Sequence, residues 1–259
     1  MSDSAATVTR LSIAPVKGLA VVPVDRVTIG PQGVAEDRRF FMLDPRGDVV
    51  TIRRHGMLEP IVPAWDPASG RLALELPGGR CVAAEVELGE LASAVLYGKP
   101  RVGREVLGPF SEALSALAGE AVRLVMADEP GTGWDEGPVS IISCASLEEV
   151  ARRAGLATVD PRRFRMLVDV EGPDPHGEDE WIGGDLRIGG ATVRAAFPIE
   201  RCAIVTKDPD SGQVDWNGLK VLADYRGKDN VCLGIAAEVS EPGEVALGDT
   251  VEVLVGTQR

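Results

Sequence analysis

Apolar and polar residues alternate along most of this chain with a period of two, which is the pattern of β-strands with one buried face. Residues 39–52 hold two apolar runs on either side of DPRG, a sequence suited to a hairpin turn. Residues 71–88 repeat this arrangement around PGG, with leucines at alternate positions before the turn. Residues 201–216, which contain DPDSG, predict a third hairpin, and residues 245–254 predict a turn and a last strand.

Helix signals are fewer. Residues 146–155 predict a helix with Ser146 as N-cap, Glu149 three residues later as in a capping box, and Gly155 as the stop. Residues 111–119 predict a second helix with two leucines on one face. The sequence has no strand–helix–strand alternation and no G-x-G-x-x-G, so a dinucleotide-binding Rossmann fold is disfavoured. It therefore predicts a mainly β protein with some α (α+β), of barrel or sandwich type.

Composition and charge narrow the class of protein. The 259 residues are 44% hydrophobic and 26% charged, enough for one large domain or two modest ones. The net charge of -13 argues against nonspecific binding to nucleic acid or an anionic membrane, since both would repel the protein. No apolar run approaches the roughly 18 residues of a membrane span, and no secretory signal is visible. We expect a cytoplasmic protein with no nucleic-acid or membrane partner.

The cysteines and histidines do not form a metal motif. The four cysteines, far apart in the sequence, are Cys81, Cys144, Cys202 and Cys232. None belongs to a C-x-x-C pair, so neither a zinc knuckle nor an iron–sulfur site is encoded, and we interpret them as thiols in a reducing compartment. The two histidines are too few and too separated for a zinc site, and the lack of G-x-S-x-G disfavours a serine hydrolase.

Basic residues recur beside the predicted turns. Lys17 follows the first strand in PVKG, Arg38 lies in EDRRF, and Arg165 lies in RRFRM. These residues form either a solvated surface or a site where several converge on a polyanion such as phosphate, which arginine grips with two N–H groups. The acid-rich residues 171–185 lack calcium-loop spacing and predict a solvated loop.

Eight motifs occur in an order that resembles one family. They are PVKG, GVAEDRRFFMLDPRGDVVTIRR, PVSIISCASLEEV, RRFRM, EDEWIG, RCAIVTKDPDSG, LADYR and VALGDTVEV. Their order resembles that of MOSC-domain proteins with an N-terminal MOSC β-barrel domain, the group that includes the mitochondrial amidoxime-reducing component. The resemblance extends from Thr9 to Val253 and implies a MOSC β-barrel with an N-terminal β-rich domain. We expect these domains at residues 1–120 and 121–259, a seam between about residues 100 and 137, and a cofactor in the cleft between the domains.

The resemblance implies a molybdenum–pterin cofactor. In such proteins the dithiolene of the pterin and one cysteine thiolate bind the metal, and that cysteine corresponds to Cys202 in the RC before DPDSG. A soft thiolate suits this metal, and the neighbouring Arg201 would help to keep the thiol ionised. By the same resemblance, the phosphate and pterin contacts fall on Lys17, Arg38, Ser143, Ser146 and Arg165.

The implied function is the reduction of N-oxygenated small molecules, with Cys202 as the catalytic metal ligand. The sequence holds no C-x₄-C-x₂-C of a plant-type ferredoxin domain, so we expect electrons from a separate partner protein. Pyridoxal phosphate binding is a further association of the family. Two other functions remain open: a sulfur carrier in which Cys202 holds a persulfide, and a non-catalytic module that has lost the cofactor.

The chain departs from the family pattern at two places. Met166 and Leu167 stand where relatives often have Pro-Asn, and Ile199 stands where many have a second cysteine. If Leu167 takes the position of the amide, the site loses one hydrogen-bonding group and gains an apolar wall. We expect a cofactor site whose preference is shifted toward bulkier, less polar N-hydroxy compounds.

Overall fold

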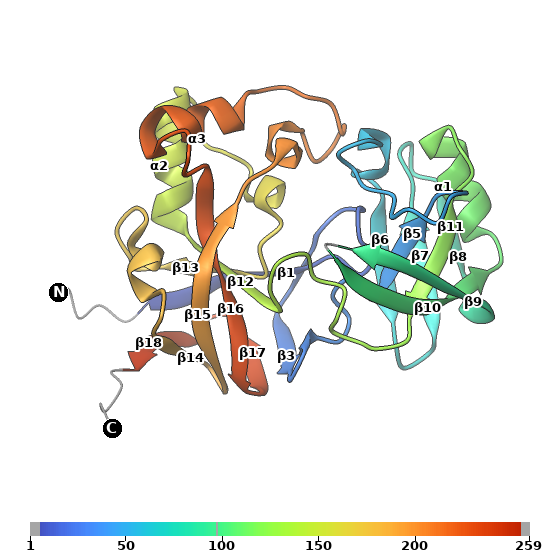
Figure 1. Cartoon of the computed structure of the whole chain (residues 1–259), viewed down its shortest axis with the longest axis horizontal. Coiled ribbons are helices and arrows are strands. Elements are labelled where there is room, and N and C mark those ends of the chain that lie inside the picture. The colour runs from blue at the N-terminus through green and yellow to red at the C-terminus, as the bar shows by residue number, and fades with distance from the viewer. Residues whose placement is uncertain (1–5, 97, 255–259) are drawn as a thin grey trace.

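The computed structural model describes residues 6–96 and 98–254. The expectation that the N-terminus carries no secretory signal rests partly on residues 1–5, which lie outside the described residues. One part of the fold, at the left of Figure 1, is a β-barrel. Strands follow one another around it in the order β13, β12, β16, β15, β14, β18 and β1, and β1 closes the ring by pairing with β13. The strands of this sheet are β1 (Ala6–Ile13), β2 (Val22–Val24), β12 (Val139–Ser143), β13 (Val168–Glu171), β14 (Asp185–Ile188), β15 (Ala191–Glu200), β16 (Cys232–Glu241) and β18 (Thr250–Leu254).

Strand β1 is the first strand of the chain, yet it completes the barrel. It pairs with β18 through Ala6 and Val251, and with β13 through Leu11 and Val168. Because side chains alternate across each strand, the inward positions of all the strands meet in one core. The fully buried residues of this core include Leu11, Ile141, Leu186, Val193 and Ile235.

The other part of the fold, at the right of Figure 1, contains two small antiparallel sheets. One has the order β5-β11-β10-β9 and the other β6-β7-β8. A further sheet joins β17, β3 and β4. The bounds are β3 (Arg26–Gly30), β4 (Gly33–Val34), β5 (Phe40–Leu43), β6 (Val62–Asp66), β7 (Arg71–Glu75), β8 (Cys81–Glu85), β9 (Glu87–Leu96), β10 (Lys99–Leu107), β11 (Arg123–Ala127) and β17 (Gly243–Ala246).

The mainly β prediction is confirmed. Strands β7 and β8 form the predicted hairpin, with Leu72 and Leu74 fully buried as the alternation requires. Strand β18 is the predicted last strand. In the predicted hairpin at residues 39–52, β5 forms the first arm, but the second arm pairs only through a bridge between Leu43 and Val49.

Both predicted helices are present, with one correction. Helix α1 (Phe110–Ala118) ends at Gly119 in the left-handed conformation, as predicted. Helix α2 (Cys144–Ala154) begins earlier than predicted, because the N-cap is Ser143, whose side chain accepts the backbone N–H of Ser146. Glu149 does not act in a capping box and instead forms ion pairs with the two arginines that follow it.

Helix α3 (Gly218–Arg226) was not among the predicted elements. Its N-cap is Asn217, whose side chain accepts the N–H of Lys220, and this asparagine is the signal that could have revealed it. Short 3₁₀ helices complete the fold: η1 (Gly56–Leu58), η2 (Pro161–Phe164), η3 (Gly177–Trp181) and η4 (Ala203–Thr206). None of the helices within the described residues is long and apolar enough to cross a membrane.

The proposed domain boundary between residues 120 and 121 stays a prediction. Strand pairing crosses it, since β1 and β3 pair with β18 and β17, and β11 pairs with β5. Strand β10 also occupies part of the segment expected to form a seam. The reason is physical: alternation shows that one face of a strand is buried, but it does not identify the neighbouring strand.

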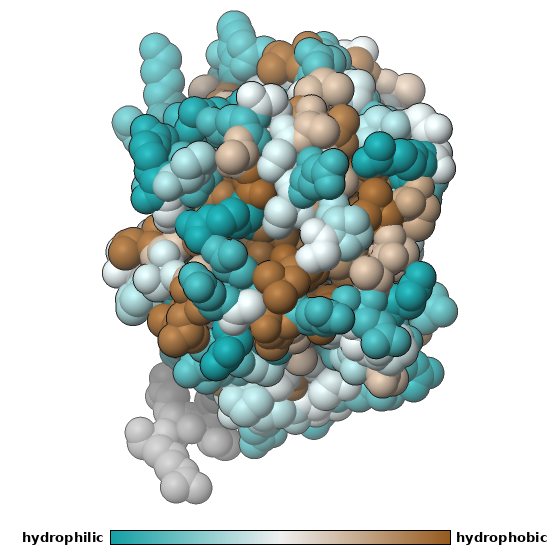
Figure 2. Space-filling model, turned by 90° about the vertical axis from the view of Figure 1, so that its right-hand side faces the viewer, coloured by the Kyte–Doolittle hydropathy of each residue, from teal (hydrophilic) through white to brown (hydrophobic). Residues whose placement is uncertain are grey.

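Apolar side chains interrupt the polar surface on the face at the right of Figure 1, as Figure 2 shows. In β9 and β10, Leu91, Val95 and Val102 are 67%, 70% and 48% exposed. Strand β9 lies at the end of its sheet order, so this apolar surface borders a sheet edge.

Candidate functional site

Lys17, Arg38 and Arg165, here called the basic cluster, come together although they lie far apart in the sequence. The chain after β1 runs beside residues 38–40, because the Lys17 N–H donates to the carbonyl of Phe40 at 2.7 Å and the Arg38 N–H donates to Ala14 at 2.7 Å. The Arg38 guanidinium reaches the carbonyl of Arg165 at 3.4 Å. These three basic residues therefore lie near one another, and their role as a phosphate site stays a prediction.

Two acidic residues partner the basic cluster. Asp135 forms an ion pair with Lys17, and Asp37 forms one with Arg38. Asp37 also accepts the backbone N–H of Ala14 at 2.7 Å, which fixes the loop after β1. Neither acid stands out in the sequence, because only the folded chain shows which of the many carboxylates lie beside the cluster.

Burial and mutual repulsion shape the electrostatics of the basic cluster. Burial lowers the pKa of Lys17; Asp135 opposes this, and Arg38 and Arg165 add to it. The pKa of Arg165 is likewise lowered by burial and then by Arg38. Burial alone would raise the pKa of Asp135, but Lys17 and Arg38 hold it below its usual value. An anion bound here would relieve the repulsion among the cations.

The backbone at two cluster residues is strained. Arg38 and Arg165 have φ values of 50° and 55°, in the left-handed region that costs non-glycine residues about 1–2 kcal/mol. Gly133 lies against Arg38, where a Cβ would overlap the Arg38 carbonyl, so only glycine permits this approach. Strain of this kind gathers at functional sites, where the surrounding structure enforces it.

Cys202 lies next to the segment that carries Arg165. The Cys202 residue is exposed and is the N-cap of η4. The neighbouring Arg201 donates hydrogen bonds to the carbonyl of Leu233 at 2.8 Å, to the carbonyl of Phe164 at 3.0 Å and to the sulfur of Met166 at 2.9 Å. Arg201 thus fastens the start of the Cys202 segment to the residues on either side of Arg165.

Arg201 itself is held inside the protein. Burial lowers its pKa to about 10, so the guanidinium remains charged at neutral pH. Its described hydrogen bonds go to backbone carbonyls and to one thioether. Its suggested effect on the ionisation of the Cys202 thiol stays a prediction.

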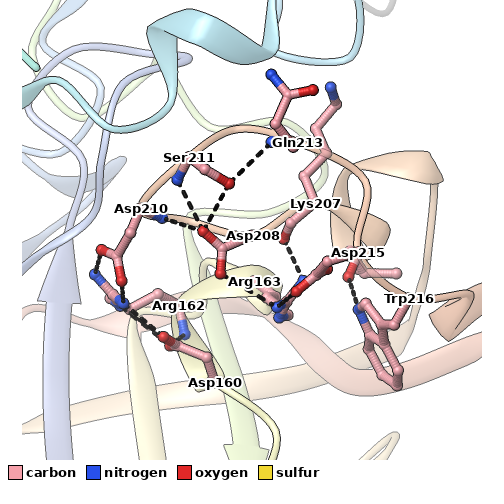
Figure 3. Close-up of polar contacts among 11 residues, drawn as sticks. Asp160, Arg162, Arg163, Lys207, Asp208, Asp210, Ser211, Gln213, Asp215 and Trp216 are labelled. Atoms are coloured by element: carbon pink, nitrogen blue, oxygen red, sulfur yellow. Dashed lines mark hydrogen bonds and ion pairs between the residues drawn. The ribbon is translucent and has the colours of Figure 1, made fainter.

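The turn after Cys202 is ordered by carboxylates (Figure 3). Asp208 accepts the N–H of Asp210 at 3.0 Å and the N–H of Ser211 at 2.8 Å. Arg162 of η2 forms an ion pair with Asp210 at 2.7 Å, and Arg163 forms one with Asp215 at 2.6 Å. These contacts tie the turn to η2, whose C-cap is Arg165.

The predicted hairpin at residues 201–216 is wrong in its first arm. Residues expected as a strand form the 3₁₀ helix η4, and the two sides of the turn pair only through a bridge between Lys207 and Val214. Val205 and Thr206 are buried side by side, which a strand with one buried face would not allow.

A close backbone contact joins η1 to this turn. A Cβ on Gly212 would overlap the Gly56 carbonyl, and a Cβ on Gly56 would overlap the Gly212 carbonyl. Gly212 also has a φ of +67°, which L side chains rarely adopt. The turn after Cys202 and η1 can therefore approach this closely only through two glycines.

Ser143 and Ser146 have a different environment from the one expected. Both are fully buried, and their hydroxyls lie 2.7 Å apart. The Ser146 hydroxyl also donates to the buried carboxylate of Glu178 at 2.8 Å. They form the cap of α2, and their proposed pterin contact stays a prediction that this burial does not support. Glu178 also shows that residues 171–185 are not simply a solvated loop.

The expectation that Leu167 forms an apolar wall of the site is corrected. Leu167 is 3% exposed and belongs to the barrel core, while its N–H binds the hydroxyl of Ser140 at 2.9 Å. Met166 lies in a second buried cluster, with its sulfur on Arg201. The sequence pattern could not show this, since a motif position does not reveal where its side chain points.

Leu167→Asn should destabilise the fold rather than restore a cofactor contact. It removes an apolar side chain from the barrel core and buries an amide there, so we expect a loss of about 3 kcal/mol or more in unfolding free energy. Urea denaturation would measure it. Leu156→Asn is the matched control, because Leu156 is 45% exposed. A Leu167→Asn variant as stable as the wild type would contradict the core position of Leu167 and would restore the expectation that Leu167 lines the site.

Acidic, cysteine and histidine side chains do not gather into a metal site in the part of the chain that the structure describes. No group of three or more of these residues is placed to hold a metal ion. His55 and His176 lie on different elements, as their sequence separation suggested.

Both parts of the chain match known family models. Residues 128–252 match the MOSC domain and residues 5–97 match the MOSC N-terminal beta barrel domain. Mitochondrial amidoxime reducing component 2 from Rattus norvegicus is 26% identical over 96% of this chain and 83% of its own length. Molybdenum cofactor sulfurase from Oryza sativa subsp. japonica is 33% identical over 36% of this chain and 12% of its own length. The solved YUAD protein from Bacillus subtilis aligns with a TM-score of 0.47 and 14% identity, over 96% of this chain and 95% of that one.

The chain is a MOSC-domain protein that also carries a MOSC N-terminal β-barrel domain. The amidoxime-reducing components are among its relatives, at low sequence identity along nearly the whole chain.

Proposed function

We propose that this protein binds a molybdenum–pterin cofactor through Cys202 and the basic cluster, and that it reduces N-oxygenated small molecules with electrons from a separate protein. The observation that supports this most is that Lys17, Arg38 and Arg165 lie close enough to repel one another, beside the segment that Arg201 joins to Cys202. The names of the amidoxime-reducing relatives support the choice of substrate. A cytoplasmic location and an association with pyridoxal phosphate stay predictions.

The residues present fit such a cofactor. A phosphate needs charged N–H donors; the basic cluster supplies cations from three separate segments of the chain, and of these Arg165 has no ion-pair partner among the described residues. A soft metal needs a thiolate that a ligand can reach, and Cys202 is exposed. Both requirements are met within one region, because Arg201 contacts the residues on either side of Arg165.

The chain's own part in the reaction would be binding and orientation. When bound, the molybdenum would supply the two-electron chemistry that amino-acid side chains lack. Lys17, Arg38 and Arg165 would hold the phosphate end of the cofactor. Arg201 would keep the Cys202 backbone fixed against the Arg165 segment, so that the thiolate and the phosphate donors remain in one arrangement.

Arg165→Gln should lower cofactor affinity by about tenfold or more, as expected when a residue supporting a metal site is lost. Molybdenum and pterin per chain would be measured on protein from a host that makes the cofactor. Arg194→Gln is the control, because Arg194 is an exposed arginine of the barrel paired with Asp185. Full cofactor content in Arg165→Gln would contradict the assignment of the basic cluster.

A sulfur carrier is the second candidate. An exposed Cys202 could hold a persulfide, and part of the chain resembles a molybdenum cofactor sulfurase. This function needs the thiol but not the basic cluster. Mass spectrometry after incubation with a donor of sulfane sulfur, which passes a sulfur atom to the thiolate without a separate oxidant, would decide it: a persulfide on Cys202, together with protein free of molybdenum, would favour the carrier.

A further inference from the structure

Glu59 is a buried carboxylate that follows η1. It is 1% exposed, and neither of its carboxylate oxygens has a hydrogen-bond partner among the described residues. Buried polar groups nearly always have partners, because leaving one unpaired costs free energy. An unpaired buried carboxylate beside a cationic site therefore calls for a functional explanation.

Glu59 and Arg165, one residue of the basic cluster, line the same small hollow. The hollow measures about 10 Å³ and is lined by Ala20, Val21, Glu59, Arg162, Arg165 and Pro209. Two segments border this hollow: η2, through Arg162, and the turn after Cys202, through Pro209. The charged groups acting on Glu59 from these elements are Arg163, Arg165, Lys207 and Asp208, with Arg165 the strongest. On the side of η1, His55 lies 2.8 Å from Glu120.

Arg165 differs from the other two cations of the cluster. Lys17 and Arg38 each have an ion-pair partner, Asp135 and Asp37. The Arg165 guanidinium donates to the carbonyl of Leu19 at 2.7 Å, and no described carboxylate lies within ion-pair distance of it. The positive charge of Arg165 is therefore the one for which an incoming anion and ionised Glu59 would compete.

Burial raises the pKa of Glu59 to about 7, although Arg165, Lys207 and Arg163 act to lower it. Glu59 is therefore neutral at lower pH and becomes ionised as the pH rises through neutrality. The ionised form places a negative charge beside Arg165, and the neutral form does not.

We propose that Glu59 sets the affinity of the basic cluster for a phosphate-type oxyanion, because ionised Glu59 competes with the anion for the charge of Arg165. The hollow is too small for a phosphate group, so Glu59 acts through Arg165 and is a positioning residue. Anion binding must then favour neutral Glu59 and take up a proton. This inference depends on the proposed function only in requiring that the cluster bind an oxyanion.

The test uses sulfate, whose charge does not change near neutral pH, on the full chain at constant ionic strength. Calorimetry at about pH 5.5 and about pH 8.5 should show wild-type affinity about tenfold weaker at the higher pH, as expected for two charges coupled at short range. In Glu59→Gln the two affinities should differ by less than about twofold. His55→Gln is the matched control, which removes the histidine nearest in sequence and should keep the wild-type pH dependence.

Each outcome is decisive. Sulfate binding whose pH dependence persists in Glu59→Gln would overturn the role of Glu59 while leaving the basic cluster as an anion site. No sulfate binding at either pH would overturn both. Proton uptake can be measured on the wild type alone, by comparing buffers with different heats of ionisation, so the test survives a variant that does not fold. Binding without proton uptake would also overturn the proposal.

Discussion

Cys202→Ser should yield a folded protein that contains no molybdenum and has no N-reducing activity. A serine hydroxyl is a far poorer ligand than a thiolate for a soft metal. Cys202 is exposed, so the change should alter the unfolding free energy by no more than about 0.5 kcal/mol. Elemental analysis of protein from a cofactor-competent host, together with a melting curve, separates loss of the metal from loss of the fold.

The matched control is Cys81→Ser. Cys81 is also exposed, but it lies in β8, on the other part of the fold from the Cys202 segment. It should keep the wild-type metal content. A Cys202→Ser protein with one molybdenum per chain would show that Cys202 is not the metal ligand. Full activity in that protein would contradict the proposed reductase function.

Gly212→Ala should cost about 3 kcal/mol or more in unfolding free energy and should also lower cofactor content. The new Cβ would overlap the Gly56 carbonyl, so η1 and the turn after Cys202 would have to move apart. The left-handed φ of +67° adds strain for any L side chain. Urea denaturation measures the first effect, and molybdenum per chain measures the second.

Gly70→Ala isolates the close contact from the backbone strain. Gly70 has a φ of +65°, nearly that of Gly212, but a Cβ there would meet nothing within 4 Å. It should lose only the roughly 1–2 kcal/mol of a left-handed alanine and keep its cofactor content. If Gly212→Ala and Gly70→Ala lose equal unfolding free energy, the close contact between η1 and the turn does not contribute to stability.

Local features of the fold follow from the sequence because short-range physics determines them. The alternating leucines before the PGG turn specify a strand with one buried face, and Leu72 and Leu74 are buried as that pattern requires. Gly119 ends α1 and Gly155 ends α2 in the left-handed conformation that glycine adopts most easily. The start of α2 does not follow from the sequence, because Ser143 and Ser146 are both suitable N-caps and only the fold selects Ser143.

The candidate site is only partly readable from the sequence. From the sequence alone, Lys17, Arg38 and Arg165 could form either a solvated surface or one pocket. The family resemblance favoured the pocket. Their convergence depends on β1 closing the barrel beside β13, while the chain after β1 runs along residues 38–40. Strand neighbours are chosen by long-range packing, so no window of sequence contains that information.

The sequence alone determined the mainly β character of the chain and the positions of its tightest turns, since alternation and turn chemistry are local. Tertiary structure alone placed Leu167 in the barrel core, and it alone placed Glu59 beside Arg165 with no hydrogen-bond partner among the described residues. Burial and charge pairing depend on which distant segments surround a side chain, and a carboxylate in an unremarkable EP sequence gains its shifted ionisation only from that environment.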